Sequence, residues 1–260
     1  MALAARTETG RKSLPGHKGQ TWGVRAPGQS IWEEASTPIH TIGERMQLGC
    51  RVFHYTLAGE SLTAAKMTAF TCDKDLETTV TVAHGIGTTA LTVTAASTIT
   101  KDQYAEGMLI VDQGTGAGDQ YIIKKNDAIA GAATGTVTIY EPGLKTAWST
   151  SDTDIALWTN PFYKITQVGA ATASGAGIPL IDITNAYYFW LQTYGPAGVL
   201  IKTAATSGTA AAEQAMHIDT AGDLTAAIAG DTIDAFSLLA ADDTVEEDAD
   251  FGYVFLNCVA

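Results

Sequence analysis

Apolar residues in this chain alternate with Thr and other polar residues in short runs, and no long segment repeats them at helical spacing. Successive side chains of a strand point to opposite faces, so this alternation is typical of half-buried β-strands. It predicts a mainly β protein, a sandwich or barrel, with strands near residues 47–57, 65–72, 89–95, 104–111, 120–124, 136–140, 162–165, 186–194, 199–202, 215–218, 232–240 and 251–259.

The run at residues 186–194 is apolar or aromatic on both faces. A strand of this kind is normally covered on both sides. We therefore assign its main aromatic residues, with those of 47–57, to the protein core or to a subunit interface: Phe53, Tyr55, Tyr188 and Trp190. Aromatic rings can also line a sugar-binding face, but alternation within a two-faced strand favours core and interface.

The texture of the sequence changes at about residue 81, where short strands begin to follow one another every 10–15 residues. This spacing is typical of a separate sandwich or barrel. We therefore expect an inserted β domain at 81–165, between the two halves of a first β domain at 41–80 and 166–260. Residues 1–40 are rich in Gly and Pro and fit no strand or helix of useful length, so they are predicted to form an extended arm.

Charge separates the predicted arm from the rest of the chain. Residues 1–32 carry five basic and one acidic residue, or +4, and the remainder carries 10 basic and 27 acidic residues, or −17. A basic arm on an acidic body suggests an acidic neighbour as its partner. Two tryptophans are unusual in a disordered segment, and the candidate binding residues of the arm are Arg6, Arg11, Lys12, Lys18, Trp22, Arg25 and Trp32. A solvated tail, or tryptophans that pack on their own domain, are the alternatives.

Several classes of partner are disfavoured by composition. The net charge of −13 makes direct binding of nucleic acid by the body improbable, because such binding needs a basic face. No apolar run approaches 18 residues, and no apolar segment follows the basic N-terminal residues, so we expect neither a membrane span nor a secretory signal. Three scattered cysteines indicate synthesis in a reducing cytoplasm.

No motif for catalysis or cofactor binding emerges from the sequence. The glycine loop at 114–119 lacks the spacing of a phosphate-binding loop, and the five histidines are isolated. The acidic segment 242–250 could hold Ca²⁺, although it lacks the spacing of a calcium loop, and Asp152 with Asp154 forms a weaker pair of the same kind. A solvated acidic loop is the simpler interpretation, so we expect no cofactor, no metal and no enzymatic activity.

Two stretches carry a resemblance to a known family. Residues 42–60 contain Ile42-Gly43, Arg51-Val52-Phe53-His54-Tyr55 and Ala58-Gly59, and the second stretch contains Tyr188-Phe189-Trp190-Leu191-Gln192, Gly195 and Ala197. Together they are similar to the head decoration (cement) proteins of tailed bacteriophages. The similarity covers 38–80 and 166–260, and the chain departs from minimal members of that family by its length and its long arm.

The resemblance implies a structural virion protein, made in the host cytoplasm, that binds the major capsid protein on the outer surface of the shell. Such proteins usually act as trimers and clamp neighbouring capsomers. Two other hypotheses remain open: a tail- or head-fibre-associated β protein that binds a receptor or glycan, and a secreted β-sandwich carbohydrate enzyme, which would need two converging carboxylates.

Overall fold

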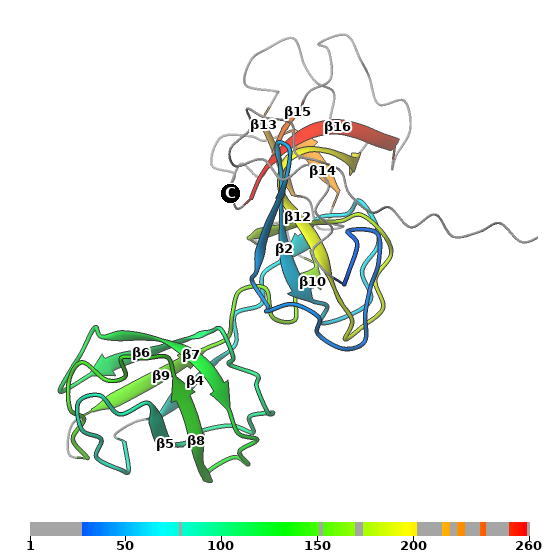
Figure 1. Ribbon diagram of the computed structural model, residues 1–260. Helices are drawn as coiled ribbons and strands as arrows, with labels where there is room; N and C mark the ends of the chain where they lie inside the picture. The colour runs from blue at the N-terminus through cyan, green and yellow to red at the C-terminus, as the bar shows by residue number, and fades with distance from the viewer. Residues whose placement is uncertain are drawn as a thin grey trace, which may run out of the picture.

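The computed structural model describes residues 28–77, 80–150, 153–169, 174–201, 215–218, 223–226, 235–237 and 250–258. Within these ranges every regular element is a β-strand, which confirms the prediction of a mainly β, sandwich- or barrel-like protein. The strands of the described ranges form two sheets in separate parts of the molecule (Figure 1), one of ten strands and one of six.

The ten-stranded sheet is organised around one long strand, β12. Its order is β10-β3-β11-β12-β14-β13-β15-β16, β2 also pairs with β12 and β1, and β16 returns to pair with β12. The last five strands of this path therefore close a circuit. The bounds are β1 Arg45–Leu48, β2 Arg51–Leu57, β3 Thr68–Ala69, β10 Thr166–Gln167, β11 Gly175–Pro179, β12 Tyr188–Ile201, β13 Ala215–Ile218, β14 Leu224–Ala226, β15 Ala235–Ser237 and β16 Asp250–Asn257.

Two strands of this sheet differ from the predicted ones. The single strand predicted at 47–57 is a hairpin of β1 and β2, because Gly49 adopts a positive φ of 63° and reverses the chain. The strands predicted separately at 186–194 and 199–202 are one continuous strand, because β12 runs through Pro196. A bulge between Gln192 and Tyr194, followed by Gly195 at φ 94°, absorbs these turn-type residues within the strand.

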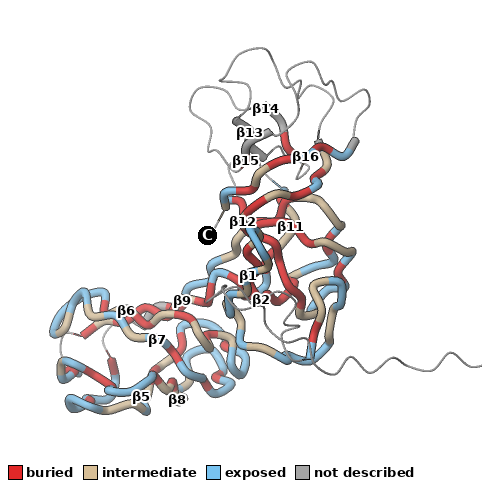
Figure 2. The backbone as a smooth tube through the Cα atoms, turned by 45° about the horizontal axis from the view of Figure 1, so that its top comes forward, coloured by how far each residue is buried: buried red, intermediate tan, exposed pale blue. Residues whose placement is uncertain are grey.

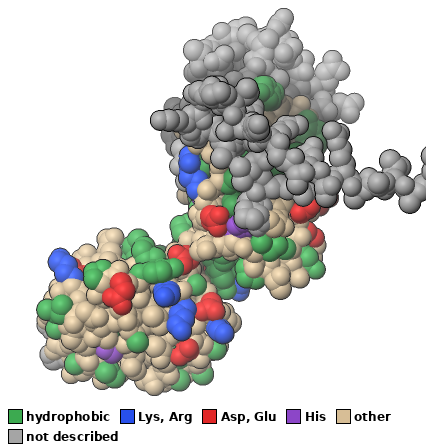
Figure 3. All heavy atoms as spheres, in the orientation of Figure 1, with side chains coloured by type: hydrophobic (Ala, Val, Ile, Leu, Met, Phe, Trp, Pro, Cys, Tyr) green, Lys and Arg blue, Asp and Glu red, His purple; other side chains and the backbone are tan. Residues whose placement is uncertain are grey.

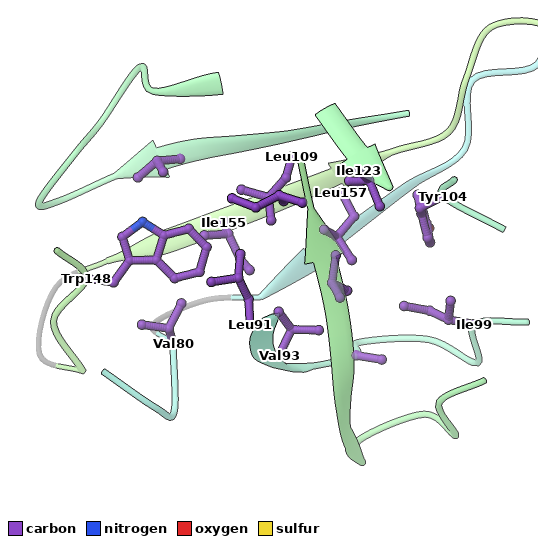
Figure 4. Close-up of a cluster of buried hydrophobic side chains, with 14 of the residues drawn as sticks. Val80, Leu91, Val93, Ile99, Tyr104, Leu109, Ile123, Trp148, Ile155 and Leu157 are labelled. Carbon is purple, nitrogen blue, oxygen red and sulfur yellow. The ribbon is translucent and has the colours of Figure 1, made fainter. Parts of the chain in front are cut away.

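The six-stranded sheet has the order β4-β9-β6-β7-β8-β5. Its core is a continuous apolar cluster that includes Leu91, Leu109, Ile123, Trp148 and Leu157 (Figure 4). Strand β4 lies before residue 81, where the inserted domain was predicted to begin. The bounds are β4 Lys74–Glu77, β5 Ala90–Thr94, β6 Met108–Gln113, β7 Gln120–Asn126, β8 Thr134–Ile139 and β9 Asp154–Trp158.

The chain passes between the two sheets twice, at neighbouring points (Figure 1). The Asp73 N–H donates to Thr159 Oγ1 and the Thr159 N–H donates to the Asp73 carbonyl, each at 3.0 Å. Asn160 Nδ2 donates to the Glu106 carbonyl at 2.9 Å, and its Oδ1 accepts the Phe162 N–H at the same distance. The strand predicted at 162–165 is instead a turn, in which Lys164 has a φ of 56°.

Residues 28–40 are packed on the ten-stranded sheet. Gln29 is buried, donates to the Tyr188 carbonyl at 2.8 Å and accepts the Tyr55 hydroxyl at 2.7 Å. Ala35 forms a bridge with Tyr188. These contacts attach residues 28–40 of the predicted arm to the folded body. The Gln29 side chain also satisfies the buried Tyr55 hydroxyl, a polar group that would otherwise lack this partner. Residues 1–27 lie outside the described residues.

Candidate docking site

Two strongly exposed aromatic residues of the ten-stranded sheet lie on its last strand. Gly252, Val254 and Leu256 are buried, whereas Phe251 and Tyr253 are 71% and 53% exposed, an alternation that is visible along β16 (Figure 2). The register places Tyr253 opposite Gly198 of β12. Because glycine has no side chain, the facing position of β12 does not cover the Tyr253 ring.

A surface hollow of about 490 Å³ adjoins this strand. We call it the aromatic hollow; its principal lining side chains are Trp32, Arg51, Leu180, Pro196 and Tyr253. Trp32 is 56% exposed, although tryptophan is normally a largely buried residue. Large exposed apolar groups around a depression are typical of contact surfaces.

Local contacts position two of the lining residues, Trp32 and Arg51. Trp32 lies in a turn closed by the Glu33 N–H, which donates to the Ser30 carbonyl at 3.2 Å, and by the Ser30 N–H, which donates to Glu33 Oε2 at 3.0 Å. Gln29 anchors the start of this turn to the sheet. Arg51 follows the β1–β2 turn, and its guanidinium lies 5.5 Å from the centre of the Phe53 ring. The hollow is therefore held by the fold before any partner binds.

The chemistry of the aromatic hollow is that of binding. It combines two exposed aromatic rings and one guanidinium with aliphatic side chains, and Trp, Tyr and Arg are the residue types that most often dominate protein interfaces. Among the described residues, no group of three or more His, Cys, Asp or Glu side chains could hold a metal ion. The absence of catalytic and cofactor sites stays a prediction. The acidic segment 242–250, considered above for Ca²⁺, lies outside the described residues apart from the backbone of Asp250.

The predicted binding residues are only partly placed. Trp32 lines the aromatic hollow, while the remaining six lie outside the described residues: Arg6, Arg11, Lys12, Lys18, Trp22 and Arg25. Of the residues assigned to core or subunit interface, Phe53, Tyr55 and Trp190 are buried within this chain, and Tyr188 is half-buried.

Sequence reasoning missed Arg51 and Tyr253 as site residues. Tyr253 had a usable signal, because 251–257 alternates aromatic residues with smaller ones, which predicts an aromatic outer face. Arg51 had none, since its position depends on the hairpin turn that was read as continuous strand.

No family model, curated protein or solved structure matches this chain. The described part of the chain contains no helix of the length and apolarity that a membrane span requires.

His54 of β2 is a buried titratable residue, and its pKa tests how dry the interior of the ten-stranded sheet is. Its ring stacks on Phe162 with centres 4.5 Å apart, and its Nδ1 lies 3.0 Å from Thr193 Oγ1. Burial, with a smaller effect from the Arg45 charge, lowers the pKa of His54 from 6.5 to about 4. The imidazole is therefore neutral in the folded protein at neutral pH.

We expect the stability of the protein to fall as the pH drops from 6.5 towards 4. In this window the unfolded chain binds a proton at His54 and the folded chain does not, so protonation favours unfolding by on the order of 2–3 kcal/mol. Urea unfolding at several pH values should show a smaller loss for His54→Gln than for the wild type. An identical pH dependence in both proteins would contradict the lowered pKa of this group.

Proposed function

We propose that this chain is a decoration (cement) protein of a tailed-bacteriophage capsid, which binds the outer surface of the shell and clamps neighbouring capsomers. The single observation that carries the proposal is the aromatic hollow, where Trp32, Arg51 and Tyr253 are held in place around a depression on the ten-stranded sheet. The residues on which the expected resemblance to decoration proteins rests lie largely on two strands that build this sheet, β2 and β12.

The fold supplies a suitable base for a clamp. The Trp32 turn, the β1–β2 turn and β16 come from distant parts of the sequence, yet all three are tied to one sheet. A rigid surface loses little conformational entropy on binding. The partner in this proposal is the major capsid protein. Self-association as a trimer would join several such contacts in one particle, and the high effective concentration of the linked sites would turn weak contacts into tight binding.

The basic segment 1–27 complements this surface in the proposal. It carries five basic residues and one acidic residue and precedes Gln29, whose side chain anchors the chain to the sheet. Arg6, Arg11, Lys12, Lys18 and Arg25 would contact acidic seams between capsid subunits, with Trp22 as a second aromatic anchor. Contacts of this type are screened by salt, so salt is expected to weaken attachment moderately.

Attachment is tested with decoration-free shells. We expect Trp32→Ala and Tyr253→Ala each to weaken co-sedimentation of the purified protein with shells by about 30-fold, because a central aromatic residue of an interface contributes about 2 kcal/mol. The matched control is Ile86→Ala, since Ile86 is 73% exposed but belongs to the six-stranded part of the chain. Deleting residues 1–27 separates the contribution of the basic segment from that of the hollow.

Unchanged attachment of both aromatic variants would contradict the assignment of the aromatic hollow as the capsid contact. The copy number in purified virions tests the role itself. Hundreds of copies per particle are expected of a cement protein, whereas a few dozen or fewer would point instead to a fibre-associated protein.

A further inference from the structure

The outer face of the six-stranded sheet carries a row of apolar side chains that runs across four adjacent chain segments. Met108 of β6 pairs with Trp158 of β9 on one side and with Ile122 of β7 on the other. The Tyr140 N–H, just after β8, donates to the Ile122 carbonyl at 3.2 Å. Paired residues of neighbouring strands share a face, so these four side chains form one row, which we call the cross-strand row.

Each end of the cross-strand row is an aromatic ring with a lysine above it. Lys74 Nζ lies 5.2 Å from the centre of the Trp158 ring, and Lys124 Nζ lies 5.8 Å from that of Tyr140. Ile122 and Tyr140 are 45% and 44% exposed. The Tyr140 hydroxyl donates to Glu106 Oε1 at 2.6 Å, which fixes the orientation of the ring. The exposed end of the row is therefore a preformed aromatic platform.

A hollow of about 300 Å³ adjoins this platform. We call it the Asp119 hollow; its polar lining includes Asp119, Tyr121, Glu141 and Lys145, and Ile122 and Tyr140 form its apolar side. Figure 3 shows that acidic, basic and apolar side chains are mixed over the visible face of the six-stranded part as a whole. Small-molecule sites characteristically combine an apolar or aromatic wall with a few fixed polar groups.

The polar groups of the Asp119 hollow are already oriented by one another. Asp119 Oδ2 accepts the Thr146 hydroxyl at 2.7 Å and the Tyr121 hydroxyl at 3.3 Å, and Asp119 Oδ1 accepts Lys145 Nζ at 3.1 Å. The Lys145 N–H in turn donates to the Tyr121 hydroxyl at 3.0 Å. The hydrogen bond from Thr146, followed by that from Lys145, lowers the pKa of the Asp119 carboxyl. Asp119 is thus a charged acceptor held beside a charged donor.

We propose that the Asp119 hollow and the adjoining platform bind a saccharide. A pyranose has an apolar face of C–H groups, which fits against the Tyr140 ring and Ile122, and a rim of hydroxyl groups, which both donate and accept hydrogen bonds. Carboxylates at Asp119 and Glu141 accept from such hydroxyls, and Lys145 donates to them. The charged groups of the hollow are two acidic and one basic, so they do not favour the phosphates of a nucleic acid.

This inference goes beyond the proposed capsid role and does not depend on it. The aromatic hollow lies on the ten-stranded sheet and the Asp119 hollow on the six-stranded sheet, and no residue lines both. Saccharide binding would give a virion-bound protein a second activity, attachment to a polysaccharide surface. The two functions can therefore be disrupted separately.

The test uses the full-length protein on an array of defined oligosaccharides, including hexamers of glucose, N-acetylglucosamine and rhamnose, followed by calorimetric titration of the strongest binder. We expect millimolar or tighter binding, a loss of at least tenfold in Tyr140→Ala, and a loss of no more than about threefold in Tyr140→Phe, which keeps the ring. Asp119→Asn should also weaken binding. Tyr253→Ala is the matched control, because it removes an exposed tyrosine from the other sheet, and it should bind saccharide like the wild type.

Two outcomes would overturn the inference. One is that no saccharide on the array binds, and the other is that Tyr140→Ala binds as tightly as the wild type while its melting temperature is unchanged. Shell co-sedimentation of Tyr140→Ala tests the alternative that the platform is a contact surface for another protein. If that variant loses attachment to shells and no saccharide binds, the platform is a protein contact and not a saccharide site.

Discussion

Replacing Trp190 by Ala is expected to lower the free energy of unfolding by about 3–5 kcal/mol, as for other fully buried large aromatic residues. Trp190 is 1% exposed and contacts both Tyr55 and His40, with ring centres 5.1 Å and 4.9 Å away. The substitution leaves a cavity where β2 and β12 pair with each other, and the surrounding sheet cannot collapse into it without moving residues 28–40.

Urea unfolding followed by circular dichroism measures this loss. Trp32→Ala is the matched control, since the same chemical change is made at a residue that is 56% exposed, and its effect should stay below about 0.5 kcal/mol. Equal stabilities for the two variants would mean that Trp190 is not part of a well-packed core. Trp190→Phe should cost less than half as much as Trp190→Ala, because most of the volume is kept.

Replacing Gly195 by Ala is expected to destabilise the protein by on the order of 2–5 kcal/mol, for two reasons that add. Gly195 has a φ of 94°, a conformation that costs a residue with a side chain about 1–2 kcal/mol. A Cβ at this position would also collide with the Cys50 carbonyl oxygen and would lie 3.0 Å from the Arg51 Cα. Cys50 lies in the β1–β2 turn and Arg51 begins β2, and both clashing atoms are backbone atoms, so the clash can be relieved only by moving that hairpin.

The control for Gly195→Ala lies three residues further along the same strand. Gly198 has no atom within 4 Å of the position where a Cβ would stand, so Gly198→Ala should change the melting temperature little. Similar melting temperatures for the two variants would contradict the close approach of β12 to the turn. Because Arg51 lines the aromatic hollow, Gly195→Ala is also expected to weaken shell attachment by displacing the β1–β2 hairpin. Gly198→Ala should leave that hairpin in place.

Sequence patterning was most informative where strands are amphipathic and bounded by clear turns. The predicted strands at 89–95, 120–124 and 136–140 correspond to β5, β7 and β8, because one face of each packs into the apolar cluster of the six-stranded sheet. Strand β9 was missed, since Ile155, Ala156 and Leu157 are consecutive buried residues without alternation. Strand β4 was missed because Lys74, Asp75 and Glu77 give it a polar sequence.

Gly and Pro were the least reliable indicators of where strands end. Gly49 lies in a turn that reverses the chain. Gly195 and Pro196, which are also typical turn residues, instead lie within a strand that continues past them. Which of these occurs depends on the partner strands, and here β2 and β16 together accompany β12 along its whole length. Sequence-local reasoning has no access to that pairing.

The candidate sites depend on contacts between residues distant in sequence. Trp32 stands out in the sequence as an unusual tryptophan, but its neighbours Arg51 and Tyr253 come from strands far along the chain. The glycine loop 114–119 was recognised as a poor phosphate site, yet the significance of Asp119 depends on Tyr121, Lys145 and Thr146, which only the fold brings to it.

The paired hydrogen bonds between Asp73 and Thr159 make the six-stranded part a removable module. The chain leaves the ten-stranded body at one member of this pair and returns at the other, so both ends of the insert are already adjacent. The entropic cost of closing a loop between adjacent ends grows only slowly with the length of the loop, so inserts of different length can be joined there at a similar cost. The body could therefore carry foreign cargo grafted at this pair, or a short linker in place of residues 74–158, as a platform for multivalent display.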